Sequence, residues 1–307
     1  MQSGMEELET MLKLPAIFSD HMILQRRKPV VVWGESDAKK VTVTIQDARV
    51  VTYVQDGKWQ LFLPPMEAGG PYVLTVKTDV DEEKVYEDVM YGEIWLAGGQ
   101  SNMELELQNS KNGDIAVTEA HNELLRFYYT PKVSYFCDEL YEQEEKSCWE
   151  LCCPENVGRW SAVGYYFARK LAAQLDVPVG IIGCNWGGTS ASCWMSREAL
   201  ENDKVISSYV EEYDAIVAEQ DFDAYCKERE EYIVYQAEFD KNCKHYYETT
   251  PNPTWEGALE VCGENKYPGP MGPRSEYRPA GLYETMIQRI APYTLAGFLY
   301  YQGEEDD

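Results

Sequence analysis

Short segments in which apolar and polar residues alternate fill the first third of the chain, from about residue 12 to residue 90. Val41-Thr-Val-Thr-Ile45 has the period of two that is typical of a half-buried strand. The turn signal Asp56-Gly57 separates two further runs. The other strand-like runs cover residues 29–33, 50–54, 59–63 and 72–76. Short strands at this spacing predict a small β-sandwich over residues 12–90, and no residue in it suggests catalysis.

From about residue 92 the pattern changes to apolar runs that alternate with a helical periodicity. Val163, Phe167 and Leu171 recur at i, i+4 and i+8 and predict one apolar helix face over residues 161–175. The apolar runs that indicate buried strands cover residues 93–97, 126–129, 179–183 and 294–301. Strands that alternate with helices predict an α/β fold, a parallel sheet with flanking helices. We therefore expect two domains, a β-sandwich at 12–90 and an α/β domain at 91–307.

The stretch from about residue 196 to residue 248 is acidic, rich in tyrosine and mostly free of glycine and proline, which predicts a helical insertion in the second domain. Residues 249–281 carry six prolines, so we expect a loop there. A last helix is predicted over residues 281–290, ahead of the final strand.

Composition and charge exclude several classes of partner. The 307 residues include 27 Lys plus Arg and 53 Asp plus Glu, a net charge of −26, which repels nucleic acid and anionic membranes. No apolar run approaches the roughly 18–20 residues that span a membrane. The first twenty residues have neither a basic nor an apolar segment of a signal peptide, so we expect a cytoplasmic location.

The nine cysteines lie between Cys137 and Cys262 and form no Cys-x-x-Cys pair. The three histidines, His21, His121 and His245, are far apart in the sequence. This spacing predicts free thiols in a reducing compartment and no metal site.

Three loops combine glycine with small polar residues directly after an apolar strand, at residues 98–103, 185–189 and 302–307. Open parallel sheets bind ligands beyond the carboxyl ends of their strands. Ser101 can present a nucleophilic hydroxyl there, although a serine after a strand more often caps a helix. Gly187-Gly188 can bring a backbone N–H to the same place or form a plain turn. Gln302 offers an amide donor, or satisfies a loop carbonyl.

At these loops the sequence resembles the sialate O-acetylesterase family, a branch of the SGNH (GDSL-like) serine hydrolases. The motifs that carry the resemblance are Gly-Gln-Ser101-Asn-Met, Gly187-Gly-Thr189 with Trp194-Met-Ser196, and Tyr301-Gln-Gly-Glu304. Further matching segments are Phe18-Ser-Asp-His-Met-Ile-Leu-Gln25, Val32-Trp-Gly34, Gly57-Lys-Trp59, Leu63-Pro-Pro65, Gly69-Gly-Pro-Tyr72 and Arg278-Pro-Ala-Gly-Leu-Tyr283. The resemblance extends from about residue 14 to residue 307.

The resemblance implies an esterase that removes O-acetyl groups from sugars such as sialic acids, without metal or cofactor. It makes Ser101 the nucleophile. The backbone N–H groups of Ser101 and Gly188 and the side-chain amide of Gln302 would form the oxyanion hole. We assign substrate contacts to Asn102, Trp186 and Glu304. The family also places a β-sandwich next to its hydrolase domain.

The sequence departs from the family pattern at two places. Ser192 stands where some members carry an acidic residue, which concerns substrate contacts. The Asp-x-x-His motif that supplies the catalytic base and its partner is absent from the sequence. We therefore expect an incomplete hydrolase domain whose C-terminal part is missing, which is nearly inactive alone and self-associates through an exposed sheet edge. A carbohydrate-binding protein without catalysis and an acetylxylan-type deacetylase are the two alternatives.

Overall fold

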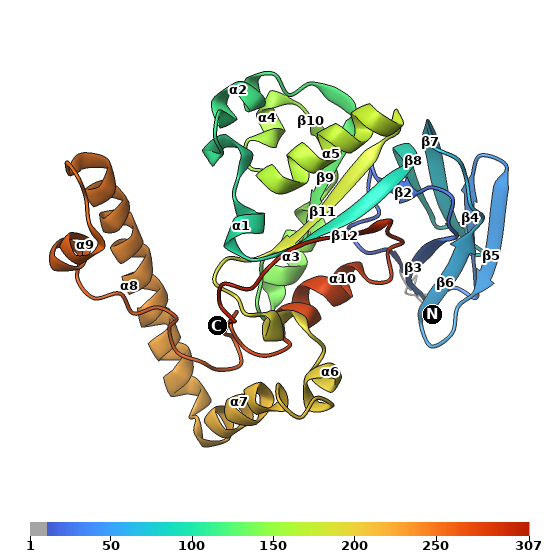
Figure 1. The fold of residues 1–307 in the computed structure, drawn as a ribbon. Coiled ribbons are helices and arrows are strands. Elements are labelled where there is room, and N and C mark those ends of the chain that lie inside the picture. Colours follow the sequence, from blue (N-terminus) through green and yellow to red (C-terminus); the bar gives the residue numbers. More distant parts are fainter. Residues whose placement is uncertain (1–10, 307) are drawn as a thin grey trace, which may run out of the picture. The chain divides into compact units, whose positions relative to one another are not determined.

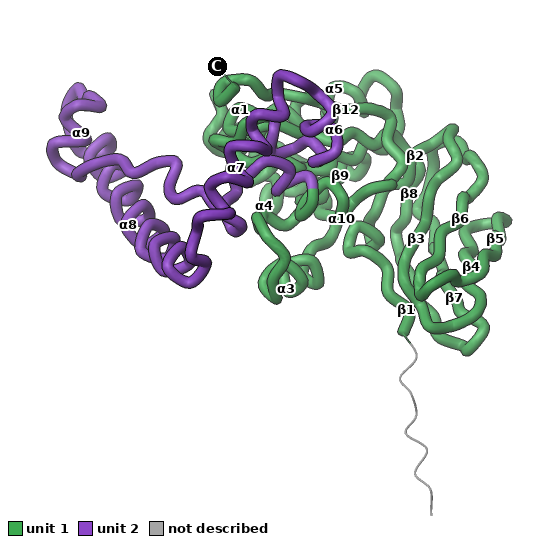
Figure 2. Tube along the Cα trace, turned by 90° about the horizontal axis from the view of Figure 1, so that it is seen from below, with its two compact units in different colours: residues 1–191, 284–307 green, residues 192–283 purple. Residues whose placement is uncertain are grey.

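The computed structural model describes residues 11–306, and the chain divides into two compact units. One unit holds the residues up to Ala191 and those from Glu284 on, and the other is Ser192–Tyr283 (Figure 2). Residues 1–10, half of the segment in which we find no signal peptide, lie outside the described residues.

The first unit begins with a region of two sheets (Figure 1). Its strands are β1 (Leu12–Lys13), β2 (Ile23–Gln25), β3 (Val30–Ser36), β4 (Lys40–Ile45), β5 (Ala48–Tyr53), β6 (Lys58–Leu63), β7 (Gly69–Thr78) and β8 (Glu83–Gly99). One sheet has the order β1-β3-β6, and the other contains β4, β5, β7, β2 and the first part of β8. Strands β4 and β6 bury every second residue, which confirms the predicted alternation. Asp56 and Gly57, both at positive φ, turn the chain from β5 to β6.

The long strand β8 belongs to two parts of the fold. Its first half pairs with β7 and β2, and residues 93–99 pair with strands of the α/β part. The sequence predicts a strand only over residues 93–97, because the apolar residues of 83–92 are interrupted by charged ones and Gly92 separates them from that run. The predicted boundary at residue 90 falls inside β8, and the limits of the two domains stay a prediction.

A parallel sheet forms the α/β part, as predicted. Its other strands are β9 (Asn122–Tyr129), β10 (Glu150–Cys152), β11 (Val179–Asn185) and β12 (Gly297–Tyr301). β11 lies between β9 and β8, β12 pairs with the other side of β8, and β8, β9, β11 and β12 run parallel. β10 adds an antiparallel edge beside β9. The fully buried β11 has the continuous apolar pattern expected of a central parallel strand.

Helices cover both faces of this sheet. The helices of this part are α1 (Ser101–Glu104), η1 (Leu107–Asn109), α2 (Gly113–Thr118), α3 (Asp138–Lys146), α4 (Pro154–Val157), α5 (Ala162–Leu175) and α10 (Gln288–Ile290). Two short elements, η2 (Ala191–Trp194) and η3 (Tyr283–Ile287), lie where the chain passes between the two units. Phe127 of β9 packs beside Gly164 of α5. Its neighbour Tyr128 points to the opposite face and packs against Trp149, near Glu144 of α3. Arg289 of α10 pairs with that Glu144.

A buried ion pair joins the two-sheet region to the parallel sheet. Arg126 of β9 is 4% exposed and donates to the carbonyl oxygens of His21 and Asp88, at 2.7 and 2.5 Å. Its guanidinium also lies 2.9 Å from the Asp88 carboxylate, which bonds His21 Nδ1 at 2.7 Å. Burial lowers the pKa of Arg126, and Asp88 opposes that shift. His21 therefore has a structural role in this cluster.

The second unit is helical, with α6 (Arg197–Glu201), α7 (Ser207–Glu219), α8 (Phe222–Thr249) and α9 (Trp255–Cys262). The first three fill the stretch predicted to be helical. The loop predicted over residues 249–281 is wrong in part, because it contains α9. Thr254 caps this helix by accepting a hydrogen bond from the N–H of Gly257, and the prolines all lie outside it.

Two observations bear on composition. All nine cysteines are free thiols in the structure. Among residues 11–306, no helix combines the length and the apolar character that crossing a membrane requires.

Candidate active site

The carboxyl ends of β8, β11 and β12 lie side by side (Figure 1). In the register of the sheet, Asn185 at the end of β11 and Tyr301 at the end of β12 both pair with Gly99. Neighbouring strands are about 4.8 Å apart. The loops that begin at Gln100, Trp186 and Gln302 therefore leave the same edge of the sheet from three adjacent strands.

Ser101 is the first residue of α1 and the second residue of the loop that follows β8. The N-cap of α1 is Gln100, which makes no side-chain capping bond. The Ser101 side chain is exposed, and its hydroxyl has no hydrogen-bond partner within residues 11–306. The structure thus gives Ser101 no capping role, and it leaves the hydroxyl accessible at the sheet edge.

Gly99 makes the close approach of β8 and β12 possible. Its φ is +138°, and a Cβ at this position would lie 2.0 Å from the carbonyl oxygen of Tyr301. The backbone N–H of Gln100 donates to that same oxygen at 3.1 Å, and the N–H of Trp186 donates to Gly99 O at 3.0 Å. A glycine is required here because any side chain would collide with the neighbouring strand.

Glu104 ties the first loop to the second. Its Oε2 accepts a hydrogen bond from the N–H of Gly187 at 2.5 Å, and its Oε1 pairs with Lys132. A Cβ added at Gly187 would lie 3.5 Å from Cβ of Ser101, so this loop passes directly beside the serine. Sequence reasoning missed Glu104 and Lys132. The signal for Glu104 is its spacing of three from Ser101, which places both on one side of a helical turn.

Gly188 follows Gly187 at a positive φ of +74°, a conformation that favours glycine. Its predicted role as an oxyanion donor stays a prediction. The side chain of Trp186 is half-buried, and its backbone N–H is the group that bonds the first loop. The structure thus brings the second loop to Ser101, as the strand order predicts.

The side-chain amide of Gln302 is already engaged. Its Nε2 donates to Thr189 O at 2.6 Å and lies 3.3 Å from Asp306 Oδ2. Its Oε1 is buried and has no partner among the described residues. In this arrangement Gln302 satisfies a loop carbonyl, the alternative that the sequence left open. Its role as an oxyanion donor stays a prediction.

Glu304 holds both neighbours of Ser101. Its Oε2 accepts a hydrogen bond from Gln100 Nε2 at 2.5 Å, and its Oε1 accepts one from Asn102 Nδ2. The bond from Gln100 is the main reason why the pKa of the Glu304 carboxyl is lowered. Asn102 and Glu304, two of the predicted substrate contacts, thus bond each other. Because Glu304 bonds the residues on both sides of Ser101, it can hold the Ser101 loop in position.

No histidine within residues 11–306 forms a hydrogen bond or an ion pair with Ser101. His21 is held by Asp88, His121 lies in the turn before β9, and His245 lies on α8 of the second unit. Nor do His, Cys, Asp and Glu side chains in the described part of the chain gather in a group of three or more that could hold a metal ion.

The contacts of Glu304 predict how its substitution changes kcat. The measurement uses the protein as encoded, with any coding sequence that follows residue 307. In Glu304→Gln, one carboxylate oxygen becomes an NH₂ group that faces the NH₂ group of Gln100 or Asn102, so one of the two bonds is lost. We expect kcat for an acetyl ester to fall about 10- to 100-fold with a smaller change in KM, because the serine is displaced. The exposed neighbour variant Glu305→Gln is the matched control, and equal kcat values for the two variants would contradict a positioning role.

The pH dependence gives the same prediction a second readout. Because the folded-state pKa of Glu304 is lowered, the carboxylate keeps its two bonds above that pKa and loses them as the pH falls through it. At a pH below the ordinary range of a glutamate, the wild-type kcat should therefore show a further decline, and Glu304→Gln should lack that part of it.

Comparisons with known proteins show which family the chain is similar to. A family model described as "SASA: Carbohydrate esterase, sialic acid-specific acetylesterase" matches residues 91–250. The chain is 28% identical over 214 residues to sialate O-acetylesterase of Rattus norvegicus, covering 62% of this chain and 38% of that protein. It is 27% identical over 209 residues to sialate O-acetylesterase of Homo sapiens, covering 62% of this chain and 40% of that protein.

A solved structure is similar over almost the whole chain. A carbohydrate acetylesterase from Xanthomonas citri superposes with a TM-score of 0.65 at 27% identity, covering 95% of this chain and 51% of that one. The chain thus spans about two fifths of the length of the curated relatives that it matches, and about half of this structure.

Proposed function

Because the chain belongs to the carbohydrate esterase family of sialic acid-specific acetylesterases, we propose that it cleaves acetyl esters on sugars with Ser101 as the nucleophile. The observation that carries this proposal is the accessible, unbonded hydroxyl of Ser101 at the edge where β8, β11 and β12 end. Ser101 Oγ would attack the acetyl carbon, expel the sugar alcohol and form an acetyl-serine that water then hydrolyses.

The negative charge that develops on the acetyl oxygen needs hydrogen-bond donors. We assign this role to the backbone N–H groups of Ser101 and Gly188 and to the amide of Gln302. Gln302 donates to Thr189 O in the structure, so it has to turn toward the substrate when the acetyl group is bound. We also propose that Asn102, Trp186 and Glu304 contact the sugar of the substrate.

A serine hydroxyl needs an adjacent base at neutral pH, and histidine is the usual one. None of the three histidines has a contact that would activate Ser101 within the described residues. We therefore propose that the 307 residues alone turn over slowly. Oxyanion stabilisation and binding would leave a residual acceleration of about 10³- to 10⁴-fold over water.

One observation favours a neutral acetylated glycan, as in acetylxylan, as a second candidate substrate class. Three carboxylates, those of Glu104, Glu304 and Asp306, bond groups of the loops or of the adjoining residues, and the cation Lys132 is paired with Glu104. This acidic balance gives an anionic sugar less electrostatic gain than a neutral one.

The proposal is tested by acetate release from 9-O-acetyl sialic acid, acetylated xylan and an aryl acetate. Both the 307-residue chain and the protein as encoded, with any coding sequence that follows residue 307, are assayed. We expect turnover of acetyl esters by the encoded protein and far less by the short chain. Binding of the sugars without acetate release by either protein would refute the esterase and support carbohydrate binding alone.

Full turnover by the short chain that His245→Ala abolishes would instead make His245 the base. That result would overturn the proposal that the 307 residues lack one.

A further inference from the structure

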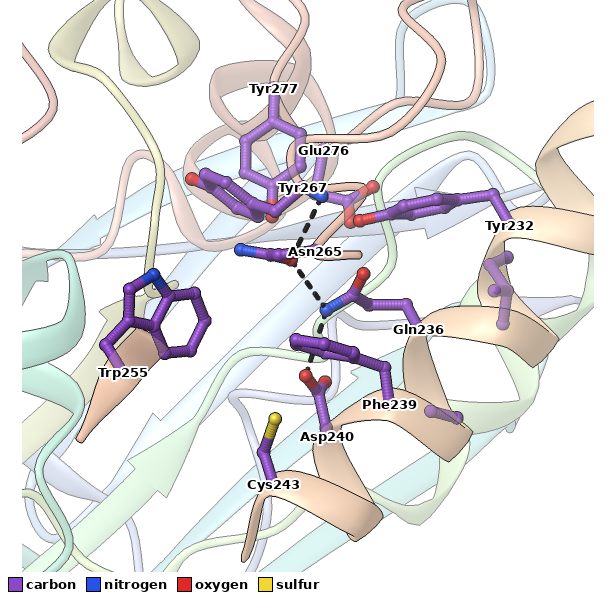
Figure 3. A pocket seen from close by; sticks show the side chains of 12 residues that line it. Tyr232, Gln236, Phe239, Asp240, Cys243, Trp255, Asn265, Tyr267, Glu276 and Tyr277 are labelled. Atoms are coloured by element: carbon purple, nitrogen blue, oxygen red, sulfur yellow. Dashed lines mark hydrogen bonds between the residues drawn. The ribbon is translucent and has the colours of Figure 1, made fainter. Parts of the chain in front are cut away.

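The second unit contains a pocket of about 580 Å³ between α8, α9 and the segment that follows α9 (Figure 3). This volume lies within the range of roughly 300–1,000 Å³ that is typical of small-molecule sites. Aromatic side chains line much of it, among them Tyr232, Trp255, Tyr267 and Tyr277. We propose that this pocket binds a neutral sugar, as a mono- or disaccharide, and that it is a second carbohydrate site distinct from the esterase chemistry.

Contacts of the lining residues and their neighbours fix the walls of the pocket. Two lining residues of α8, Phe239 and Cys243, pack against Ala258 of α9 in a small apolar core. The segment after α9 is held on α8 by the Arg229–Glu276 ion pair at 3.0 Å and by a hydrogen bond from Tyr235 Oη to Glu264 O at 2.7 Å. The walls of the pocket are therefore formed in the absence of a ligand, which lowers the entropy cost of binding one.

The polar groups of the pocket supply both donors and acceptors. Gln236 Nε2 donates to Asp240 Oδ1 at 2.9 Å and to Asn265 Oδ1 at 3.3 Å, which joins the three side chains across the pocket (Figure 3). Gln236 Oε1 is buried and has no partner among the described residues. Asn265 Nδ2 also donates to no group in residues 11–306. An unpaired acceptor and an unpaired donor match the hydroxyl groups of a sugar, which can act as either.

The aromatic groups suit the apolar faces of a sugar ring. Trp255 is 45% exposed although it packs at 83° against Phe239, at 6.3 Å between ring centroids. On the other side, Tyr267 and Tyr277 pack edge to face at 5.4 Å. Large flat rings give contact area at little cost in side-chain entropy.

The charges exclude other classes of ligand. Asp240 and Glu276 are the carboxylates that line the pocket, and Arg229 compensates Glu276. The remaining negative charge opposes an anionic sugar such as sialic acid. A pocket for a cation would be lined by aromatic rings and carboxylates alone. The amide N–H donor of Asn265, which points into this pocket, opposes the binding of a cation. A neutral sugar therefore fits the pocket best.

The test uses saturation-transfer NMR and calorimetric titration of the 307-residue chain with methyl β-glucoside, cellobiose, N-acetylneuraminic acid and choline. We expect a neutral sugar to bind with a Kd on the order of 1 mM, and both charged ligands to bind at least tenfold more weakly. Trp255→Ala, on α9, and Gln236→Met, on α8, should each weaken binding about tenfold or more. Tyr247→Ala, an equally exposed aromatic residue of α8 outside the pocket, should bind like wild type.

Two results would overturn the proposal. The first is that no neutral sugar binds, or that choline or N-acetylneuraminic acid binds as tightly as the neutral sugar. The second is sugar binding that survives both pocket substitutions unchanged, since a sugar bound at the Ser101 loops would behave in that way. Thermal unfolding of each variant shows whether it is folded, and the two substitutions lie on different helices, so a folding defect of one leaves the other informative.

Discussion

Replacing Ser101 with alanine is expected to lower the turnover of an acetyl ester at least about 10³-fold in the protein as encoded. The substitution removes Oγ, the atom that forms the acetyl-serine in the proposed mechanism, and it leaves the proposed oxyanion donors and the loop contacts in place. KM should change little, since the methylene carbon and the backbone N–H of residue 101 remain. The measurement is the steady-state rate of acetate release, with circular dichroism to show that the variant is folded.

A second serine supplies the control for Ser101→Ala. Ser110 lies nine residues further along the chain, where its hydroxyl donates a hydrogen bond to Leu107 O at 2.8 Å. Ser110→Ala should keep most of the activity. Turnover by Ser101→Ala close to that of Ser110→Ala would mean that another group is the nucleophile.

The largest effect on stability is expected from Gly99→Ala. The added Cβ would lie 2.0 Å from the carbonyl oxygen of Tyr301, and the backbone φ of +138° is strained for any residue other than glycine. Relief of the collision has to push β12 away from β8. We expect a loss of roughly 3 kcal/mol or more in the free energy of unfolding, from overpacking and from backbone strain together.

The same displacement moves Gln100 and Ser101, which follow Gly99 directly. Activity should therefore fall about 100-fold in the fraction that stays folded. Urea unfolding gives the stability, and hydrogen exchange at the amides of β12 shows where the structure opens.

Gly57→Ala separates the two causes of the Gly99 effect. Gly57 also has a positive φ, +76°, but no atom lies within 4 Å of the position that an added Cβ would take. The control thus carries backbone strain without a collision and should cost roughly 1 kcal/mol. If Gly99→Ala lost no more stability than Gly57→Ala, the close approach of β12 would not matter for the fold.

The sequence predicts these strands well because each is a short apolar run with a glycine at its end or within two residues after it. Residues 93–97, 179–183 and 294–301 are such runs, and each corresponds to a strand of the parallel sheet. The loops that follow them share one edge because parallel strands end on the same side. This part of the site depends on local pattern and chain direction alone.

The contacts between the loops could not be read from the sequence. Glu304 bonds Gln100 across 204 positions, and Glu104 bonds Gly187 across 83. Such pairs depend on the register of β8, β11 and β12, which no local pattern encodes. Helix α9 was missed for a different reason, because the prolines around it obscure an eight-residue helix with a good N-cap.

The continuity of β8 has a consequence for how this protein can be divided and how it evolves. The strand that ends at the Ser101 loop starts among the strands of the two-sheet region, where β7 and β2 are its partners. A gene fragment that began at residue 91 would remove those partners and leave the start of the central strand without neighbours. The two-sheet region therefore cannot be exchanged or deleted like a module on a flexible linker, and substitutions in its core are expected to shift the loop that carries Ser101.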